Sequence, residues 1–411
     1  MIGVGVAGPL GDADGEERGA QRLIVVQGAA FGPAAERAAW ISLASVPGIG
    51  PVGFAAVLQR FGTALAALEA PAGEVVRQLP RSAPETQEAL AALRQVGGAK
   101  VARRLEQATR RAGGSVVTAL DGAYPELLAR LEGRPPVLYV LGPTDALGHA
   151  AVAVVGTRHP SGYGLSAAAE IADELARAGL TVVSGLAIGI DGRAHLAALE
   201  AGGRTVAVLP SPIDRVYPPR HRQLAARIVA EGGALVSESP PGRMSGKPDF
   251  ARRNRIISGL AQATVVVEAP DHSGALLTAA AAIAQGRELY AVPGQIDAAA
   301  SRGCNRLIAD HDAELITSPP SLLHRLGLAS RNPHRRHLVA TLSEAEGVVL
   351  GALLKRSGSI EELGARSHLA TPALASALTL LEARGLAASY GGVTFHATLV
   401  ARRMGHGEAG K

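Results

Sequence analysis

The apolar positions between residues 151 and 318 fall into short runs that alternate with helical patterns. The runs are Ala151–Val155, Thr181–Ser184, Thr205–Leu209, Ala234–Ser237, Thr264–Glu268, Glu288–Val292 and Glu314–Ile316. Helical periods fill the intervals at 164–178, 191–201, 221–231, 253–262, 274–285 and 303–310. Continuous apolar strands separated by helices are typical of a parallel sheet that is buried on both faces. The pattern therefore predicts an α/β domain at 151–318 with a doubly wound, Rossmann-like parallel sheet.

Helical patterns flank this domain on both sides. Residues 35–113 predict a small helical domain, in which the turn Pro47–Pro51 between two helices resembles a helix-hairpin-helix. The backbone N–H groups of such a hairpin can hold a DNA phosphate, but a plain helical corner is an open alternative. Residues 339–400 predict three helices and a Gly-tipped hairpin, the pattern of a winged helix. Residues 340–400 carry four basic and five acidic residues, which favours an accessory or protein-contact module over a DNA reader.

The remaining segments lack a sustained period. We expect disordered tails at 1–34 and 401–411, a linker at 319–338 and a Pro-rich connector at 114–150, in which 135–140 looks like a strand entering the next domain. Whether the first tail belongs to the native protein stays open. The histidines of the linker have no nearby carboxylate or Cys, so a solvated linker is favoured over a metal site.

Composition narrows the class of protein. The chain has 411 residues, of which 47% are hydrophobic and 19% charged, and wholesale disorder is therefore excluded. Its single cysteine, Cys304, excludes a disulfide framework and a Cys-based zinc site. No apolar run reaches the length of a membrane span, and no basic stretch followed by an apolar one marks a secretory signal. We expect a cytoplasmic protein with no membrane partner and no metal.

Basic residues concentrate in one stretch of the chain. The net charge is +5, and residues 204–255 alone contain ten basic and four acidic residues. A basic stretch on an otherwise nearly neutral protein suggests a polyanionic partner.

Candidate binding residues follow the predicted strands, because ligands of doubly wound sheets bind beyond the carboxyl ends of the strands. The small residues, N–H-rich turns and arginines expected at that edge are Gly156, Thr157, Arg158, Ser184, Gly185, Gly189, Asp191, Arg215, Arg253, Asn254, Arg255, Ser273 and Gly274. Asp191 could act as a general base, but we favour a helix N-cap. Tyr163, Tyr217 and Phe250 are the aromatic residues best placed to stack on bases.

Several enzyme classes do not fit this edge. No G-x-G-x-x-G follows the first strand, and the second ends in Ser-Gly rather than in the acid that would hold a ribose, so NAD is not expected. The segment Gly242–Pro248 is not a P-loop, and no G-x-S-x-G nucleophile elbow is present. We therefore expect no cofactor.

An ordered set of strings carries a family resemblance. The strings are Val154–Arg158, Ser184–Asp191, Asp214 with Tyr217–Pro219, Phe250 with Arg253–Gly259, Val267–Ala269 with Ser273–Gly274 and Thr278–Ala279, Pro293–Gly294, and Arg302–Gly303 with Asn305–Ile308. Together they resemble the DNA processing protein A family, also called DprA or Smf, over residues 120–320. Thr157, Ala251 and His221 depart from the usual Ser, Pro and Asn of that pattern.

The resemblance implies a function and partners. It implies a cytoplasmic, non-catalytic homodimer of natural transformation or recombination that binds and protects incoming single-stranded DNA and loads RecA onto it. Arg158 would then grip the DNA backbone, Arg215 would take the basic position before Tyr-Pro, and Arg253–Arg255 would line the same pocket. The dimer contact would lie at 303–317, where Leu307, Ile308, Leu315 and Ile316 are either contact surface or core.

An enzyme remains the alternative. Related Rossmann-like proteins of the lysine-decarboxylase-like group bind or process nucleotides with the signature Pro-Gly-Gly-x-Gly-Thr-x-x-Glu. The equivalent turn here, His272–Thr278, has no following Glu, which argues against that chemistry. Whether the host is naturally transformable stays open.

Overall fold

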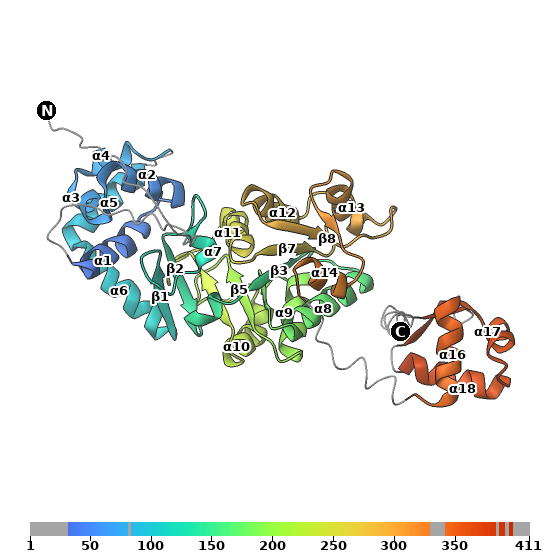
Figure 1. Ribbon diagram of the computed structural model, residues 1–411. Helices are drawn as coiled ribbons and strands as arrows, with labels where there is room; N and C mark the ends of the chain where they lie inside the picture. Colours follow the sequence, from blue (N-terminus) through green and yellow to red (C-terminus); the bar gives the residue numbers. More distant parts are fainter. Residues whose placement is uncertain (1–31, 81–83, 329–341, 384–385, 391–393, 398–411) are drawn as a thin grey trace, which may run out of the picture. The chain divides into compact units, whose positions relative to one another are not determined.

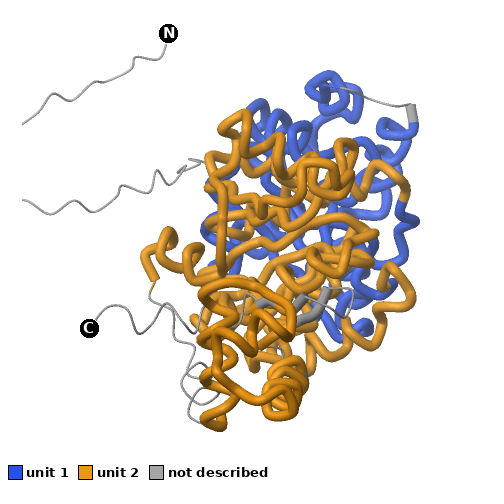
Figure 2. The backbone as a smooth tube through the Cα atoms, turned by 90° about the vertical axis from the view of Figure 1, so that its right-hand side faces the viewer, with its two compact units in different colours: residues 1–141, 211–215, 236–245 blue, residues 142–210, 216–235, 246–411 orange. Residues whose placement is uncertain are grey.

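Two compact units make up the part of the chain that the structure describes. The computed structural model describes residues 32–80, 84–328, 342–383, 386–390 and 394–397. Unit 1 contains the chain up to Leu141 together with Ser211–Arg215 and Val236–Ser245, and unit 2 contains the remainder. Figure 2 colours the two units.

Unit 1 combines a helical cluster with a two-stranded hairpin. Its elements are α1 (Pro33–Ala44), α2 (Pro51–Phe61), α3 (Ala64–Glu69), α4 (Ala72–Val76), α5 (Pro84–Val96), α6 (Gly98–Arg111), β1 (Gly114–Thr118), α7 (Glu126–Ala129) and β2 (Val137–Leu141). Glycine and proline set the α1–α2 turn: Gly48 has a positive φ of 84°, Gly50 is the N-cap of α2, and Pro51 is its first residue. Trp40 and Phe54 meet edge to face across the two helices, with ring centroids 4.8 Å apart.

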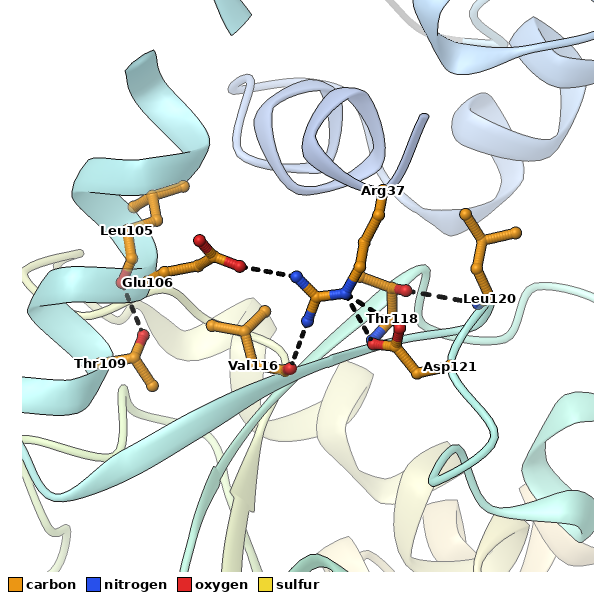
Figure 3. Close-up of polar contacts among 8 residues, drawn as sticks. All are labelled: Arg37, Leu105, Glu106, Thr109, Val116, Thr118, Leu120 and Asp121. Atoms are coloured by element: carbon orange, nitrogen blue, oxygen red, sulfur yellow. Dashed lines mark hydrogen bonds and ion pairs between the residues drawn. The ribbon is translucent and has the colours of Figure 1, made fainter. Parts of the chain in front are cut away.

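An arginine of α1 ties the helical cluster to the hairpin. Arg37 donates to Glu106 on α6 at 2.6 Å, to Asp121 after β1 at 2.9 Å, and to the carbonyl oxygen of Val116 on β1 at 2.8 Å (Figure 3). Partial burial alone would raise the pKa of Asp121, but the hydrogen bonds from Arg37 and Thr118, together with the charge of Arg37, outweigh it and hold that pKa below its usual value. Three segments of unit 1 therefore depend on one guanidinium.

Unit 2 is built on a parallel sheet. Its strands are β3 (Ala151–Val155), β4 (Thr181–Ser184), β5 (Thr205–Leu209), β7 (Ala263–Val266), β8 (Glu288–Ala291) and β9 (Glu314–Leu315), while β6 (Ala234–Ser237) is where the chain passes from unit 2 to unit 1. They pair in the order β5-β4-β3-β7-β8-β9, all parallel. The order reverses at β3, because β4 lies on one side of it and β7 on the other. Such a switch point is where doubly wound sheets bind their ligands.

Helices cover both faces of this sheet. They are η1 (Thr144–Leu147), α8 (Gly162–Arg177), α9 (Ile190–Glu200), η2 (Pro219–His221), α10 (Arg222–Ala230), α11 (Lys247–Gly259), α12 (Gly274–Ala284), η3 (Ala299–Ser301), α13 (Arg302–Ala309) and α14 (Pro319–Arg325). Apolar side chains of α8, α9 and α14 share one buried core with those of the strands, while α11 and α12 lie on the opposite side (Figure 1). The expected doubly wound α/β fold is thus confirmed.

The last part of the chain forms a separate small core. It contains α16 (Glu344–Lys355), β10 (Gly358–Ser359), α17 (Ile360–Ser367), α18 (Thr371–Ala383), β11 (Ala387–Tyr390) and β12 (Thr394–Ala397). The three strands form an antiparallel sheet in the order β10-β12-β11. The buried residues of this core include Leu353, Leu363 and Leu378 on the helices and Phe395 on β12. This is the element order of a winged helix, and that interpretation stays a prediction.

The structure differs from the sequence expectations in three segments. The expected connector contains a second strand, β1, besides the strand expected at 135–140, which is β2; the two pair antiparallel with Val116 opposite Tyr139. The expected linker begins with α14, because Leu322 and Leu323 are fully buried in the core of unit 2. The helix expected from residue 253 already begins at Lys247, since Gly246 is its N-cap and Pro248 fits its first turn. The expected tails, apart from residues 32–34, lie outside the described residues, as does the second half of the linker, residues 329–338.

None of the helices described here is both long and apolar enough to cross a membrane.

Candidate nucleic-acid interface

A cleft lies at the carboxyl ends of β3, β4 and β7 in unit 2. Its volume is about 640 Å3. Eight of the thirteen candidate residues line it, namely Gly156, Thr157, Arg158, Asp191, Arg253, Asn254, Ser273 and Gly274. A small hollow beside it is lined by Arg158, Gly185, Arg253, Tyr217, Pro218 and Phe250, among others. The sequence rule for doubly wound sheets therefore named residues that mostly line one cleft, and their role in binding stays a prediction.

The turn after β3 is held in place by its neighbours. The backbone N–H of Thr157 donates to the carbonyl oxygen of Glu268 at 2.7 Å, and its carbonyl oxygen accepts from Ile190 N–H at 3.2 Å. Gly189 has a φ of +90°, and a Cβ there would lie 2.4 Å from the carbonyl oxygen of Thr157. Only glycine allows this close approach. The cleft thus has a fixed backbone wall before any ligand binds.

Arg158 and two aromatic rings form one exposed cluster beside this turn. The Arg158 guanidinium carbon lies 5.7 Å from the centroid of the Phe250 ring, a cation–π distance. Tyr217 meets the same ring edge to face, with centroids 5.4 Å apart and planes at 83°. Tyr217 remains 47% exposed. An exposed cation and an exposed aromatic side chain are therefore held together by one phenylalanine.

Arg253 lies under the cleft rather than within it. Its side chain is 7% exposed and donates to the carbonyl oxygens of Gly185, at 2.6 Å, and of Val208. Burial lowers the pKa of Arg253 to about 10, with the charge of Arg158 acting in the same direction and that of Asp191 opposing it. The guanidinium plane lies against Gly185, where a Cβ would come within 2.6 Å of it. Its position indicates a structural support for the cleft.

Asp191 and Ser184 also face inward. The Asp191 carboxylate accepts N–H bonds from Gly185 at 3.1 Å and from Ala187 at 3.3 Å, so it organises the loop after β4. The expected N-cap role is wrong, because Gly189 is the N-cap of α9 and Asp191 lies inside its first turn. Burial raises the pKa of Asp191, against the opposing charge of Arg253. Ser184 donates its hydroxyl to the carbonyl oxygen of Val154 at 2.6 Å.

The opposite end of the cleft is the start of α12. Ser273 is the N-cap of this helix and accepts from Ala275 N–H at 3.3 Å. Asn254 donates to the carbonyl oxygen of Gly274 at 3.1 Å, which joins α11 to this turn. The partial positive charge of a helix N-terminus favours an anion here.

Arg302, at the start of α13, is a lining residue that the strand-end reading missed. Its side chain is exposed. It follows β8, so the rule that placed the other candidates would have found it if applied to the last strands of the sheet. His159 and His272 line the cleft as well and were also missed.

Four candidates do not line the cleft or the hollow beside it. Ser184 and Gly189 support the turns, as described above. Arg255 is half-buried on α11, and its carbonyl oxygen accepts from Gln285. Arg215 belongs to unit 1, where its guanidinium reaches the sulfur of Met244 at 3.5 Å.

The charges at the cleft favour an anion. Arg158 and Arg302 are exposed cations, whereas Asp271 pairs with Arg306 at 2.9 Å and Asp191 is buried. Across the described residues, no group of three or more His, Cys, Asp or Glu side chains could hold a metal ion. The cleft thus presents N–H groups and guanidinium groups rather than carboxylates.

Comparisons with known proteins agree with this geometry. The family model of DNA recombination-mediator protein A matches residues 115–327, and that of the DprA-like N-terminal HHH domain matches residues 34–74. A DNA processing protein DprA of Mycobacterium tuberculosis is 42% identical over 306 residues, which cover 70% of this chain and 78% of that protein. Protein Smf of Escherichia coli is 44% identical over 203 residues, 49% of this chain and 54% of that protein.

A solved structure supports the same assignment. DNA processing protein A of Streptococcus pneumoniae superposes with a TM-score of 0.60 at 32% identity, covering 70% of this chain and 97% of that one. The resemblance drawn from the ordered strings is therefore confirmed. The chain belongs to the DNA recombination-mediator protein A family, the DNA-processing proteins called DprA or Smf.

Proposed function

We propose that unit 2 binds single-stranded DNA across the cleft, with the backbone on the Gly156–Arg158 turn and a base against Tyr217. The observation that carries the proposal is the cluster in which Arg158 and Tyr217 both pack on Phe250, at 5.7 and 5.4 Å. A single strand offers both a phosphate and an unpaired base face to such a cluster. A duplex hides its base faces in the stack and suits the cluster less well.

The far end of the cleft supports a second phosphate contact. The N-terminus of α12 and the exposed Arg302 both lie on the cleft wall. With Arg158 at the near end, the cleft offers two guanidinium groups to one strand. A DNA strand with several phosphates can contact both ends of the cleft, whereas a single nucleotide can contact only one.

We further propose that this site binds without catalysis. The Asp191 carboxylate is held by two backbone N–H groups, and the Glu268 carboxylate accepts from the backbone N–H and hydroxyl of Ser161 at 2.9 and 2.5 Å. A carboxylate can act as a general base only where it faces the substrate, and both of these carboxylates are committed to the protein. Processing of a small nucleotide remains the competing function, and the test below separates the two.

The test is an anisotropy titration of labelled single-stranded DNA, duplex DNA and mononucleotide over a series of salt concentrations. Removing a charge-assisted phosphate contact with Arg158→Ala should weaken single-strand binding by about 1–3 kcal/mol. Binding of a strand gives a steep dependence on salt, with a slope of about −0.7 per phosphate contact, and a nucleotide gives a shallow one. Arg177→Ala, which removes a cation paired with Asp173 on α8, is the control. Tight mononucleotide binding with a shallow slope would favour the enzyme.

We also propose the homodimer and the RecA partner that the resemblance implies, in a cytoplasmic protein. β9 pairs with β8 and ends the sheet of unit 2, and its Leu315 is 38% exposed. Leu307 and Ile316 are buried, so Ile308 and Leu315 are the apolar side chains left for a contact. Leu315→Glu should yield monomers by light scattering with an unchanged melting temperature; a monomeric wild-type chain would refute the dimer. RecA loading predicts faster RecA filament assembly on single-stranded DNA when the chain is added.

A further inference from the structure

The face of α6 that points away from the core of unit 1 carries a stripe of cations. Lys100, Arg103, Arg104 and Arg111 occupy positions i, i+3, i+4 and i+11, which lie on one side of an α-helix, and Arg110 lies beside them. All five side chains are exposed. We name these five residues the α6 stripe.

The stripe is not neutralised by nearby carboxylates. Within the described part of unit 1, no ion pair joins any of its five cations to a carboxylate, whereas Arg37 is paired twice. Glu106 is the acidic residue of α6, and its carboxylate is turned to Arg37 at 2.6 Å (Figure 3). In unit 2, by comparison, Arg177 and Arg227 each pair with an acid one turn away. The stripe is thus a concentrated positive surface.

The helix holds this stripe rigidly. On its inner side Ala102 is buried in a core with Ile41, Val137 and Tyr139, and Leu105 packs against the same core. The backbone of a packed helix fixes the spacing of its charges, so less conformational entropy is lost when they meet a regular array of opposite charges.

The dimensions and chemistry of the stripe fit a nucleic-acid backbone. From Lys100 to Arg111 the helix rises about 16 Å at 1.5 Å per residue, whereas one strand of duplex DNA has a phosphate about every 3.4 Å of helix axis. Several phosphates therefore lie within its reach. The sequence of α6 contains no aromatic residue, so it offers no platform for unpaired bases. Contacts that use the backbone alone suit the rigid, regular duplex.

We propose that the α6 stripe is a second nucleic-acid contact, which binds the phosphate backbone of duplex DNA without reading sequence. The residues of the stripe belong to unit 1, whereas those lining the cleft belong to unit 2. The proposal goes beyond single-strand binding, and it can fail while the cleft assignment stands.

The test compares two triple variants of the full chain in salt titrations of a blunt duplex and of a single strand. The first is Arg103→Gln/Arg104→Gln/Arg111→Gln. The control is Arg177→Gln/Arg193→Gln/Arg227→Gln, which removes the same charge from arginines that pair with carboxylates. Losing three phosphate contacts should make the slope of log affinity against log salt concentration for the duplex shallower by about 2.7. Between about 50 and about 200 mM salt, the stripe variant should therefore lose about 40-fold less duplex affinity than the wild type loses.

The proposal is supported if the duplex salt slope becomes shallower in the stripe variant and changes little in the control variant. The slope measured with single-stranded DNA should change less than the duplex slope. An unchanged duplex slope in the stripe variant would overturn the proposal, as would an equal change in the control. An equal loss for single and double strands would overturn the duplex assignment. Competition by polyglutamate that exceeds competition by duplex at equal charge would point to an acidic protein partner and would also overturn it. Melting curves of each variant check the fold, and Arg158→Ala measured alongside keeps the cleft assignment under separate test.

Discussion

Arg253→Met should destabilise the chain far more than Arg158→Met, although both arginines lie at the same cleft. Arg253 donates to two buried carbonyl oxygens and lies near the buried carboxylate of Asp191. Methionine keeps much of the side-chain volume but leaves those acceptors and that carboxylate without their cation. Removing one partner of a buried charge pair costs about 3–5 kcal/mol. At about 2–4 °C per kcal/mol for a unit of this size, the melting temperature should fall by about 6–20 °C.

The assay is thermal unfolding followed by far-UV circular dichroism at neutral pH, with a single-strand titration of each variant that stays folded. Arg158 is exposed and makes a cation–π contact with Phe250, so Arg158→Met should change the melting temperature by no more than about 2 °C. It should nevertheless weaken DNA binding. If Arg253→Met melts as the wild type does, the guanidinium does not support the cleft and the structural role assigned to it is wrong.

Three further outcomes follow from the packing and charges described above. Gly185→Ala places a Cβ within 2.6 Å of the Arg253 guanidinium and should cost about 1–3 kcal/mol in urea unfolding; Gly162→Ala, where nothing lies within 4 Å, is the control and should be neutral or stabilising. The pKa of Asp121 is lowered in the folded chain, so its contact with Arg37 adds stability above the unfolded pKa, and that stability is lost as the pH falls through the folded value. Arg37→Met should therefore lower the melting temperature at neutral pH and much less at acidic pH, and a pH-independent difference would contradict the ion-pair account. Removing residues 340–411 should leave single-strand affinity within tenfold, since α18 carries no basic residue in its last turn; a larger loss would show that this region touches DNA.

The sheet of unit 2 was predictable because its strands are buried on both faces. Such strands need continuous apolar runs, and the bounds expected for β3, β4 and β5 agree with those observed. The helix N-terminus at Ser273 was found for a similar reason, since a serine before a helical period is a local signal.

Other features depend on contacts between distant residues, which sequence patterns do not carry. Arg253 and Arg158 look alike in the sequence, yet one is buried against two carbonyl oxygens and the other is exposed. Asp191 stands at a helix start, but the positive φ of Gly189 makes that glycine the N-cap. The α6 stripe was missed because a count over a long window averages its five cations with their neighbours, whereas helical spacing gathers them on one face.

The most direct test of the account is photo-crosslinking of single-stranded DNA that carries 5-bromouracil, followed by mass-spectrometric mapping of the crosslinked peptides. Base stacking on the aromatic cluster predicts crosslinks at Tyr217 or Phe250, and their loss in Arg158→Ala under conditions where single-strand binding is weakened. Crosslinks that map only to residues outside the cleft of unit 2, with none at Tyr217 or Phe250, would contradict the proposal that this cleft binds single-stranded DNA.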